Sequence, residues 1–560
     1  MNVSTSSLDA PYASLKSISA LPPEILLNIF EEVYLASCDL DVDTPDDLTD
    51  LRLFPRCITG VCKAWKKLIK SVPHFATQIM IFVDEPVSPS DLAAEFKISK
   101  SLLIKVFVIR RDYSPAEDML EKRRVKGVMQ VLARHITRCK VVVFDLLHNS
   151  SLPRITDFSG SACKLRTLRV KCRLPGLVDD HVQPTPSLAR EPDAFLCPSL
   201  QYLDLDGRVF IAAMRIPGWD ESIRLLTQKR LSITNITYSE GQDFDLHKFL
   251  VALSKLGHLT TLELSNVDLD SWSCIGRESP SIFIQNFEFE GLNGDFITGF
   301  FAHHHNRIEV SNISFTNCQL GPTEYLHCWR LNLQRILPGE DITEFVKDWD
   351  GFGLHIQDCP GLDDRLLELL SNFQASKEAL FAPTLRELHI SSSGSLSVQA
   401  VKNLVFIRGI EAEMHDPELD GGQCLPMYSI SVADSGPSPS PEDRQWLEEK
   451  LERFWWYTTP ASCESPILDC DCSQWDFSEF NDPELEGPDT QSQQPPPPDS
   501  PILSQDYSLI EWSPEDKFLN TYLAVLGQCG KPDAAQLPFR LNRPQRSPTT
   551  FPLQGLVVHV

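Results

Sequence analysis

The 560-residue sequence lacks a long apolar run: no segment approaches the roughly 20 uninterrupted apolar residues that cross a bilayer. Its first residues, MNVSTSSLDAPYASLKS, are polar and do not have the basic-then-apolar pattern of a secretory leader. Basic residues are scarce as well, with 51 Lys and Arg against 77 Asp and Glu, which gives a net charge of −26. This balance disfavours a binder of nucleic acid or of membranes. We therefore expect a cytoplasmic or nuclear protein.

Motifs of the common catalytic and nucleotide-binding sites are also missing. The sequence has no G-x-S-x-G, H-E-x-x-H, G-x-x-x-x-G-K-[ST], G-x-G-x-x-G or C-x-x-C pattern. The tract His303-His304-His305 has no companion cysteines or histidines at ligand spacing, so a polar turn is the preferred interpretation. We expect no enzyme, no metal ion and no other cofactor.

Cysteine is present but does not form a disulfide-type pattern. The 16 cysteines are scattered along the chain, and most lie beside apolar residues, as Cys139, Cys318 and Cys359 do. In a reducing compartment such residues behave as small buried hydrophobes. This interpretation agrees with a location in the cytoplasm, the nucleus or both.

Charge and proline separate a tail, residues 411–560, from the rest of the chain. The tail holds 26 acidic and 8 basic residues and 20 of the 41 prolines. Such a segment buries too little apolar surface to fold alone, so we expect it to be largely disordered. Amphipathic stretches near 442–457 and 513–528 predict short helices within it. These helices would either cap the preceding domain or bind partners, and the sequence favours neither.

The first ordered region follows a polar N-terminus, residues 1–17, which is predicted to be disordered. Apolar residues then recur at helical spacing: Leu26, Ile29, Phe30 and Val33. Leu21 and Ile25 add a second strip, so this helix has more apolar surface than one neighbour usually covers. Another helix resumes at Gly60, and its apolar face consists of Val61, Cys62, Trp65, Leu68 and Ile69.

Together, the segments LPPEILLNIF and GVCKAWKKLIKSVPHFATQI resemble an F-box, the three-helix module by which substrate receptors bind the Skp adaptor of cullin–RING ubiquitin ligases. The resemblance covers residues 18–76. The acidic loop 39–50 is longer than in a compact F-box, and Phe75 stands where many members have tryptophan. By resemblance, nine residues form or support the adaptor-binding surface: Leu21, Pro22, Glu24, Ile25, Ile29, Phe30, Val61, Cys62 and Trp65. The alternative is an ordinary helical hairpin that packs on the next domain.

Residues 77–410 contain a series of short segments of the form L-x-x-L-x-L. Nine occur in order, of which those at Leu231 and Leu354 are incomplete. Their middle apolar residues are Phe144, Leu168, Leu203, Leu231, Leu262, Phe287, Ile313, Leu354 and Leu388. Steps of 24 to 41 residues centre on the length of a leucine-rich repeat with insertions. The longest step, from Ile313 to Leu354, requires such an insertion. In this repeat the three apolar residues turn inward and the residues between them face outward.

Divergent repeats of this kind commonly follow an F-box in fungal-type receptors, which the first 410 residues resemble. The resemblance implies an α/β fold class: a three-helix F-box, an irregular leucine-rich-repeat solenoid with parallel strands, and the acidic tail. An ordinary α/β domain with a mostly parallel sheet is the alternative for the middle region. The two differ in whether the sheet extends as an arc or closes into a globule.

The resemblance also implies a function, that of a non-catalytic substrate receptor in a Skp–cullin–F-box ubiquitin ligase. The F-box would bind the Skp adaptor and, through it, the cullin, while the repeats hold a target protein. The mechanism would be positional, because the receptor raises the effective concentration of target lysines at an active site on another subunit. The alternative is a repeat scaffold for protein interactions without a role in ubiquitination.

Overall fold

The structure is a computed structural model of the whole chain. It describes residues 21–38, 54–86, 88–111, 119–158, 160–174, 195–216, 218–219, 229–236, 244–270, 280–303, 310–323, 326–374, 379–414 and 424–458. The N-terminal segment 1–17, the acidic loop 39–50 and the tail beyond residue 458, with its predicted helix near 513–528, lie outside this range.

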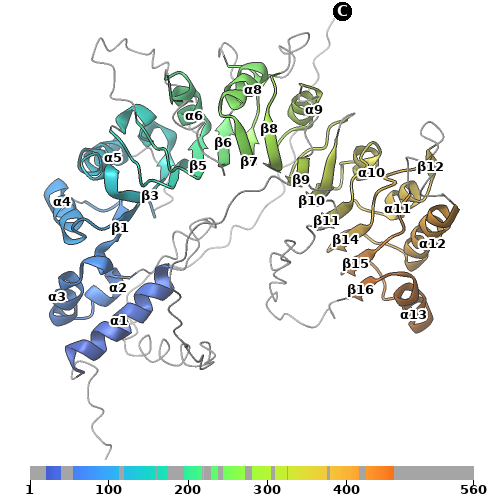
Figure 1. Cartoon of the computed structure of the whole chain (residues 1–560), viewed down its shortest axis with the longest axis horizontal. Helices are drawn as coiled ribbons and strands as arrows, with labels where there is room; N and C mark the ends of the chain where they lie inside the picture. Colours follow the sequence, from blue (N-terminus) through green and yellow to red (C-terminus); the bar gives the residue numbers. More distant parts are fainter. Residues whose placement is uncertain are drawn as a thin grey trace, which may run out of the picture. The chain divides into compact units, whose positions relative to one another are not determined.

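One sheet of 14 parallel strands organises the described residues, and its spatial order is the order of the strands along the chain (Figure 1). The strands are β1 (Gln78–Phe82), β2 (Ile104–Ile109), β3 (Cys139–His148), β4 (Thr167–Leu174), β5 (Tyr202–Asp206), β6 (Arg230–Ile236), β7 (His258–Val267), β8 (Phe283–Glu290), β9 (Val310–Thr316), β10 (Cys328–Gln334), β11 (Gly353–Gln357), β14 (Glu387–Ser391), β15 (Ser429–Ala433) and β16 (Arg453–Tyr457). A separate antiparallel pair joins β12 (Phe373–Gln374) and β13 (Ala379–Leu380). The α/β class with a parallel sheet is confirmed.

Helices follow most of the strands, and all of those after β1 lie on one face of the sheet (Figure 1). They are α4 (Pro89–Ile98), α5 (Met119–Leu132), α6 (Gly207–Met214), α8 (Leu246–Lys255), α9 (Gly294–His303), α10 (Ile342–Val346), α11 (Asp364–Leu370), α12 (Val398–Met414) and α13 (Pro441–Lys450). No described helix covers the opposite face, which we call the open face. None of the helices in the described ranges combines the length and the apolar character that crossing a membrane requires.

Short polar side chains fix where several of these helices begin. At each such position a side-chain oxygen accepts a hydrogen bond from a backbone N–H of the first turn, which satisfies one of the donors that a helix leaves unpaired. The residues in this role are Ser88, Asp206, Asp245, Asp341, Asp363 and Ser440. The helices therefore start at defined points and present their apolar sides to the sheet.

Two rows of apolar side chains cross all 14 strands and face the helices. The first row is Ile79, Val106, Val142, Leu168, Leu203, Leu231, Leu262, Phe287, Ile313, Leu331, Leu354, Leu388, Ile430 and Phe454. The second row lies two residues further along each strand, from Ile81 on β1 to Trp456 on β16. Together with the helices, these rows enclose one continuous apolar core. All nine predicted segments are strands of this sheet.

The register of β3 differs from the prediction. Val142 pairs with Leu168, so the apolar triplet of this strand is Cys139, Val142 and Phe144 rather than Val141, Phe144 and Leu146. Val141 lies on the open face instead. The sequence CKVVVFDLL is apolar on both faces, so it lacks the alternation that sets a register.

The 41-residue step between Ile313 and Leu354 contains a strand instead of an insertion. Leu331 of β10 pairs with Ile313 on one side and with Leu354 on the other. The repeat pattern is hidden there because its first position is Cys328 and the exposed Trp329 follows it. The predicted insertion is therefore wrong.

The repeats were predicted to end at residue 410, but the sheet continues beyond this residue. Helix α12 runs to Met414, and β15 and β16 extend the sheet to Tyr457. The helix predicted near 442–457 ends at Lys450, and an aromatic strand, RFWWY, follows it. Aromatic residues favour strands, and Phe454 and Trp456 fill the two apolar rows on β16.

Eight strands end in the same kind of turn. The residue two positions after the second apolar row has a positive φ, between 48° and 62°, at Asn235, Asn266, Gly291, Asn317, Arg335, Asp358, Ser392 and Asp434. Asn, Asp and Gly tolerate this left-handed conformation best. At several of these positions the backbone N–H still donates to the next strand, as Asp358 does to the Ser391 carbonyl at 3.0 Å. A common exit turn keeps the strands in register.

Candidate functional site

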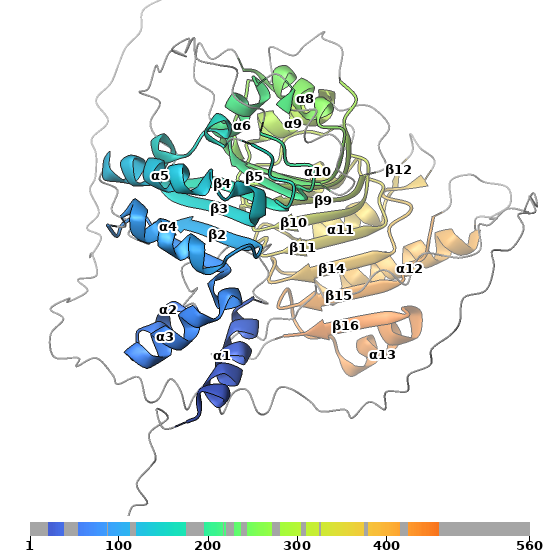
Figure 2. The same cartoon turned by 60° about the vertical axis from the view of Figure 1, so that its left-hand side comes forward.

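Three short helices form a module before the sheet, namely α1 (Pro23–Cys38), α2 (Arg56–Thr59) and α3 (Lys63–Ser71), followed by a 3-10 turn (Pro73–Ala76) (Figures 1 and 2). The module has its own apolar core, separate from that of the sheet: Leu26, Phe30, Phe54, Ile58, Trp65, Ile69 and Phe75. The Tyr34 hydroxyl lies 2.7 Å from the Thr77 hydroxyl, which ties α1 to the start of β1. A module with a core of its own can present its outer surface to a partner.

Aromatic rings hold this module together. Phe30 of α1 packs edge-on against Trp65 of α3, with 5.0 Å between ring centroids. Phe75 is buried and packs against Phe54, with 4.9 Å between ring centroids. Cys62 precedes α3, and its Sγ accepts a hydrogen bond from the Trp65 N–H at 3.5 Å. Aromatic pairs of this geometry stabilise by about 1 kcal/mol beyond the area they bury.

The structure divides the nine predicted adaptor-binding residues into a surface group and a core group. The exposed residues are Leu21, Pro22, Glu24, Ile25 and Val61. Ile29 and Cys62 are half-buried, whereas Phe30 and Trp65 are buried in the module core. Phe30 and Trp65 therefore support the surface without being available to contact a partner.

Sequence reasoning missed one exposed apolar residue of α1. Leu35 lies ten residues after Ile25, and the two are similarly exposed. It belongs to neither of the two apolar strips recognised in the sequence. With Leu21, Ile25 and Val61, the described part of this module exposes four large apolar side chains. Exposed apolar side chains grouped on one small module indicate a surface that a partner covers.

The open face of the sheet changes character along its length. On β1 to β3 it is apolar, where Met80, Phe82, Phe107, Ile109, Val141 and Val143 pack on one another. From β4 to β8 it carries ion pairs, and from β9 to β15 it carries mainly neutral polar groups. Side chains that face outward between inward-facing apolar residues are the ones available to ligands.

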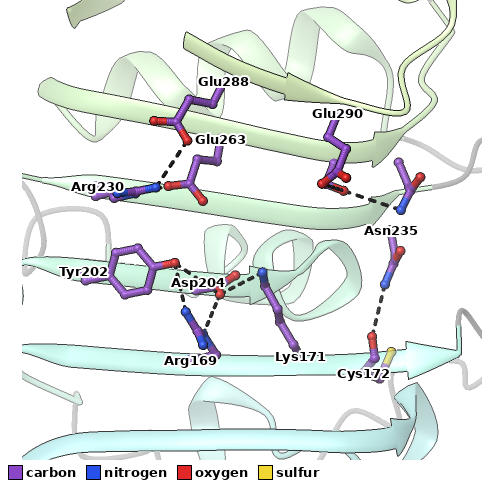
Figure 3. Close-up of polar contacts among 12 residues, drawn as sticks. Arg169, Lys171, Cys172, Tyr202, Asp204, Arg230, Asn235, Glu263, Glu288 and Glu290 are labelled. Carbon is purple, nitrogen blue, oxygen red and sulfur yellow. Dashed lines mark hydrogen bonds and ion pairs between the residues drawn. The ribbon is translucent and has the colours of Figure 1, made fainter. Parts of the chain in front are cut away.

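Arg169 of β4 and Asp204 of β5 form an ion pair that is almost completely buried (Figure 3). Asp204 Oδ2 accepts from Arg169 Nε at 2.7 Å and lies 2.9 Å from Lys171 Nζ, and the Tyr202 hydroxyl donates to the same oxygen. Burial alone lowers the pKa of Arg169, but the nearby Asp204 and Tyr202 raise it overall. Burial raises the pKa of Tyr202 and of the neighbouring Asp206. This cluster is internally paired, which suits a structural role.

A second group lies on β6 to β8, where Arg230 pairs with Glu263 and, at 3.2 Å, with Glu288 (Figure 3). Burial raises the pKa of Glu263, against the opposite effect of Arg230. Glu290, on the same face of β8 as Glu288, accepts a hydrogen bond from the Ser265 hydroxyl at 3.3 Å. Arg230 is thus already paired with two carboxylates, which again suits a structural role.

Five neutral residues occupy register-matched positions on β9 to β15: Ser314, Asn332, His355, His389 and Ser431. The His355 and His389 rings lie 5.5 Å apart. Burial, with help from His389 and Arg330, lowers the pKa of His355 to about 4, and burial lowers that of His389. Both imidazoles are therefore neutral near pH 7. This row offers donors and acceptors without charge.

Within the described ranges, no group of three or more His, Cys, Asp or Glu side chains is placed to hold a metal ion. Of the nine cysteines whose side chains are described there, all are free, and seven are buried. Their predicted role as small buried hydrophobes is thus confirmed for those seven.

The described residues thus form a helical module joined to an α/β domain whose main sheet has 14 parallel strands. No protein-family model matches the sequence, and no curated protein matches it either.

Proposed function

We propose that this protein is a substrate receptor of a Skp–cullin–F-box ubiquitin ligase, with residues 18–76 as its F-box. The observation that carries the proposal is the separation of Leu21, Ile25 and Val61, which are exposed, from Phe30 and Trp65, which hold the module together. Covering such side chains with a partner is favourable by about 25 cal/mol per Å² of apolar area. This is the surface that the resemblance assigns to the Skp adaptor.

We further propose that the sheet is a leucine-rich-repeat array that holds the target. Three features support this interpretation: sequential strand order, helices on one face only, and an exit turn that recurs at eight strands. Doubly wound α/β domains place helices on both faces and reverse the strand order at a switch point. Repeat arrays instead stack each unit on its chain neighbours.

On this proposal the protein positions the target on the ligase and does not itself catalyse the transfer of ubiquitin. The F-box fixes the receptor on the ligase, and the array holds the target so that its lysines lie near the conjugating enzyme. Binding both partners raises the local concentration of the target, to the millimolar range for short connections. The reaction itself takes place at another subunit.

A purification with three versions of the full chain tests the proposal. The wild type, the Leu21→Ala/Ile25→Ala variant and the control Leu102→Ala/Leu103→Ala are expressed while the proteasome is inhibited, and bound proteins are identified by mass spectrometry. Leu102 and Leu103 are matched in exposure to the first pair but precede β2. We expect the adaptor and cullin with the wild type and the control but not with the first variant, which keeps its targets. If all three versions purify with the same partners and none of them with the adaptor, the scaffold alternative would be favoured.

A further inference from the structure

A stripe of aromatic and cationic side chains runs along the rim of the sheet where its last strands begin. Its members, which we call the rim stripe, are Trp329, Phe352, Arg386 and Tyr428. Each precedes the first apolar row of its strand by two residues, on β10, β11, β14 and β15. Backbone hydrogen bonds link them in sequence, since the Phe352 N–H donates to the Trp329 carbonyl at 2.7 Å and the Tyr428 N–H to the Arg386 carbonyl at 2.9 Å.

Arg386 is held between two rings of this stripe. Its guanidinium carbon lies 5.8 Å from the centroid of Phe352 and 5.3 Å from that of Tyr428. Arg453 lies over the same Tyr428 ring, also at 5.3 Å. Stacking occupies the faces of a guanidinium and leaves its N–H edge available for hydrogen bonds.

This guanidinium has no carboxylate partner in the part of the chain that is described. Its Nε is buried and makes no hydrogen bond there, and no side chain pairs with its charge. Other arginines on the sheet differ in this respect, since Arg169, Arg230 and Arg330 all have carboxylate partners. The neighbouring Glu387 is engaged by Arg330. The two Nη groups of Arg386 are not among the buried polar atoms and make no hydrogen bond in the described ranges, so a ligand carboxylate can reach them.

Trp329 supplies an apolar contact at one end of the stripe. It is 60% exposed, and its ring centroid lies 6.0 Å from that of Phe352. Trp, Tyr and Arg dominate the residues that contribute most to protein–protein binding. A partner that places an acidic residue at Arg386 and an apolar residue at Trp329 would engage both features.

We propose that the rim stripe binds an extended acidic segment of the target protein. One carboxylate of the segment forms a two-pronged ion pair with Arg386, a geometry that the planar guanidinium favours. An apolar side chain a few residues away packs on Trp329. The proposal rests on the proposed target-binding role of the sheet and adds the chemistry of what is bound there.

Peptide selection on the full chain tests this proposal. A library of random 12-residue peptides displayed on phage is selected against the wild type, and the selected peptides are synthesised and titrated by fluorescence anisotropy. We expect Asp or Glu beside an apolar or aromatic residue to be enriched. Replacing that acidic residue by Asn or Gln weakens binding at least tenfold.

Variants of the protein locate the site. Arg386→Gln and Trp329→Ala weaken binding of the selected acidic peptides at least tenfold, whereas the exposed Arg365→Gln on α11 leaves it unchanged. Thermal melting checks that each variant is folded, and Arg386→Lys serves as a milder change if Arg386→Gln melts early. Recovery of no peptide, no acidic enrichment, or equal binding by Arg386→Gln and Arg365→Gln would overturn the proposal. Adaptor binding, measured on the same preparations, reports on the F-box alone, so the two proposals fail separately.

Discussion

Arg330 on β10 reaches over the intervening strand β11 to pair with Glu387 on β14, with 3.1 Å between Nη2 and Oε2. The residue between them is Gly353, and a Cβ there would lie 3.2 Å from Cγ of Arg330 and 3.6 Å from Oε2 of Glu387. The missing side chain therefore opens the path for an ion pair between strands that are not adjacent.

Gly353→Val should break the ion pair between Arg330 and Glu387. In the glycine background, a double-mutant cycle with Arg330→Gln and Glu387→Gln should give a coupling energy of about 0.5–1 kcal/mol, since the pair is half-buried. In the Gly353→Val background we expect a coupling near zero, because the valine side chain lies in the path of Arg330. Urea unfolding of the four variants in each background measures both values. Equal coupling in the two backgrounds would show that Gly353 does not open the path.

Arg408 should be essential for the packing of α12. This side chain is 0% exposed, and its guanidinium donates to five backbone carbonyls, those of Leu370, Phe381, Ala382, Pro383 and Leu385. Burial lowers the pKa of Arg408. Arg408→Met removes all five of these buried hydrogen bonds, so we expect a loss of about 3 kcal/mol or more of unfolding free energy. The exposed Arg365→Met should change it by less than about 0.5 kcal/mol, and similar urea midpoints for the two variants would refute the role of Arg408.

His355 should make the protein less stable in mild acid. Burial, with His389 and Arg330, lowers its pKa from 6.5 to about 4, so the folded chain keeps it neutral where the unfolded chain binds a proton. Stability is therefore lost as the pH falls from about 6.5 towards 4, and regained as it rises. Between pH 7 and pH 4, we expect the wild type to lose about 3 kcal/mol more than His355→Gln. Parallel stability profiles for the two proteins would contradict this expectation.

Cysteine alkylation should separate exposed from buried thiols. Cys163 is exposed, whereas burial raises the pKa of Cys139 and of Cys197 to about 12. At pH 8 a thiol with this pKa is thiolate in roughly one molecule in 10,000, and the thiolate is the reactive form. Iodoacetamide treatment followed by peptide mass mapping should label Cys163 rapidly and the other two only after urea is added. Similar labelling rates in the native protein would argue against this core.

The sequence predicted those parts of the fold that repeat a simple pattern. Strands such as β5 and β7 alternate apolar and polar residues, so their inward residues could be identified. Strands β1 and β2 were not predicted, because they are apolar on both faces and lack that alternation. β10 and β16 were missed because tryptophan and cysteine occupy repeat positions that leucine usually fills.

The surfaces were predicted less completely than the strands. Two apolar strips on one helix indicated more apolar surface than one neighbour covers, but not which strip is buried; in the structure Leu26 and Phe30 face the module core, whereas Leu21 and Ile25 are exposed. The polar contacts of the open face could not be predicted, because partners such as Arg169 and Asp204 are 35 residues apart and meet only through the sheet register. The rim stripe depends on the same register.

Direct binding of a purified Skp-type adaptor to the full-length protein tests the central proposal most directly. Isothermal titration calorimetry would compare the wild type with Ile25→Asp and with the control Leu103→Asp, since Ile25 is 46% and Leu103 is 47% exposed. A charge placed in an apolar interface is strongly unfavourable, whereas the same charge on an uninvolved surface is tolerated. The account predicts one-to-one binding by the wild type and the control, and affinity at least tenfold lower for Ile25→Asp. No binding by the wild type, or equal affinity for all three, would contradict it.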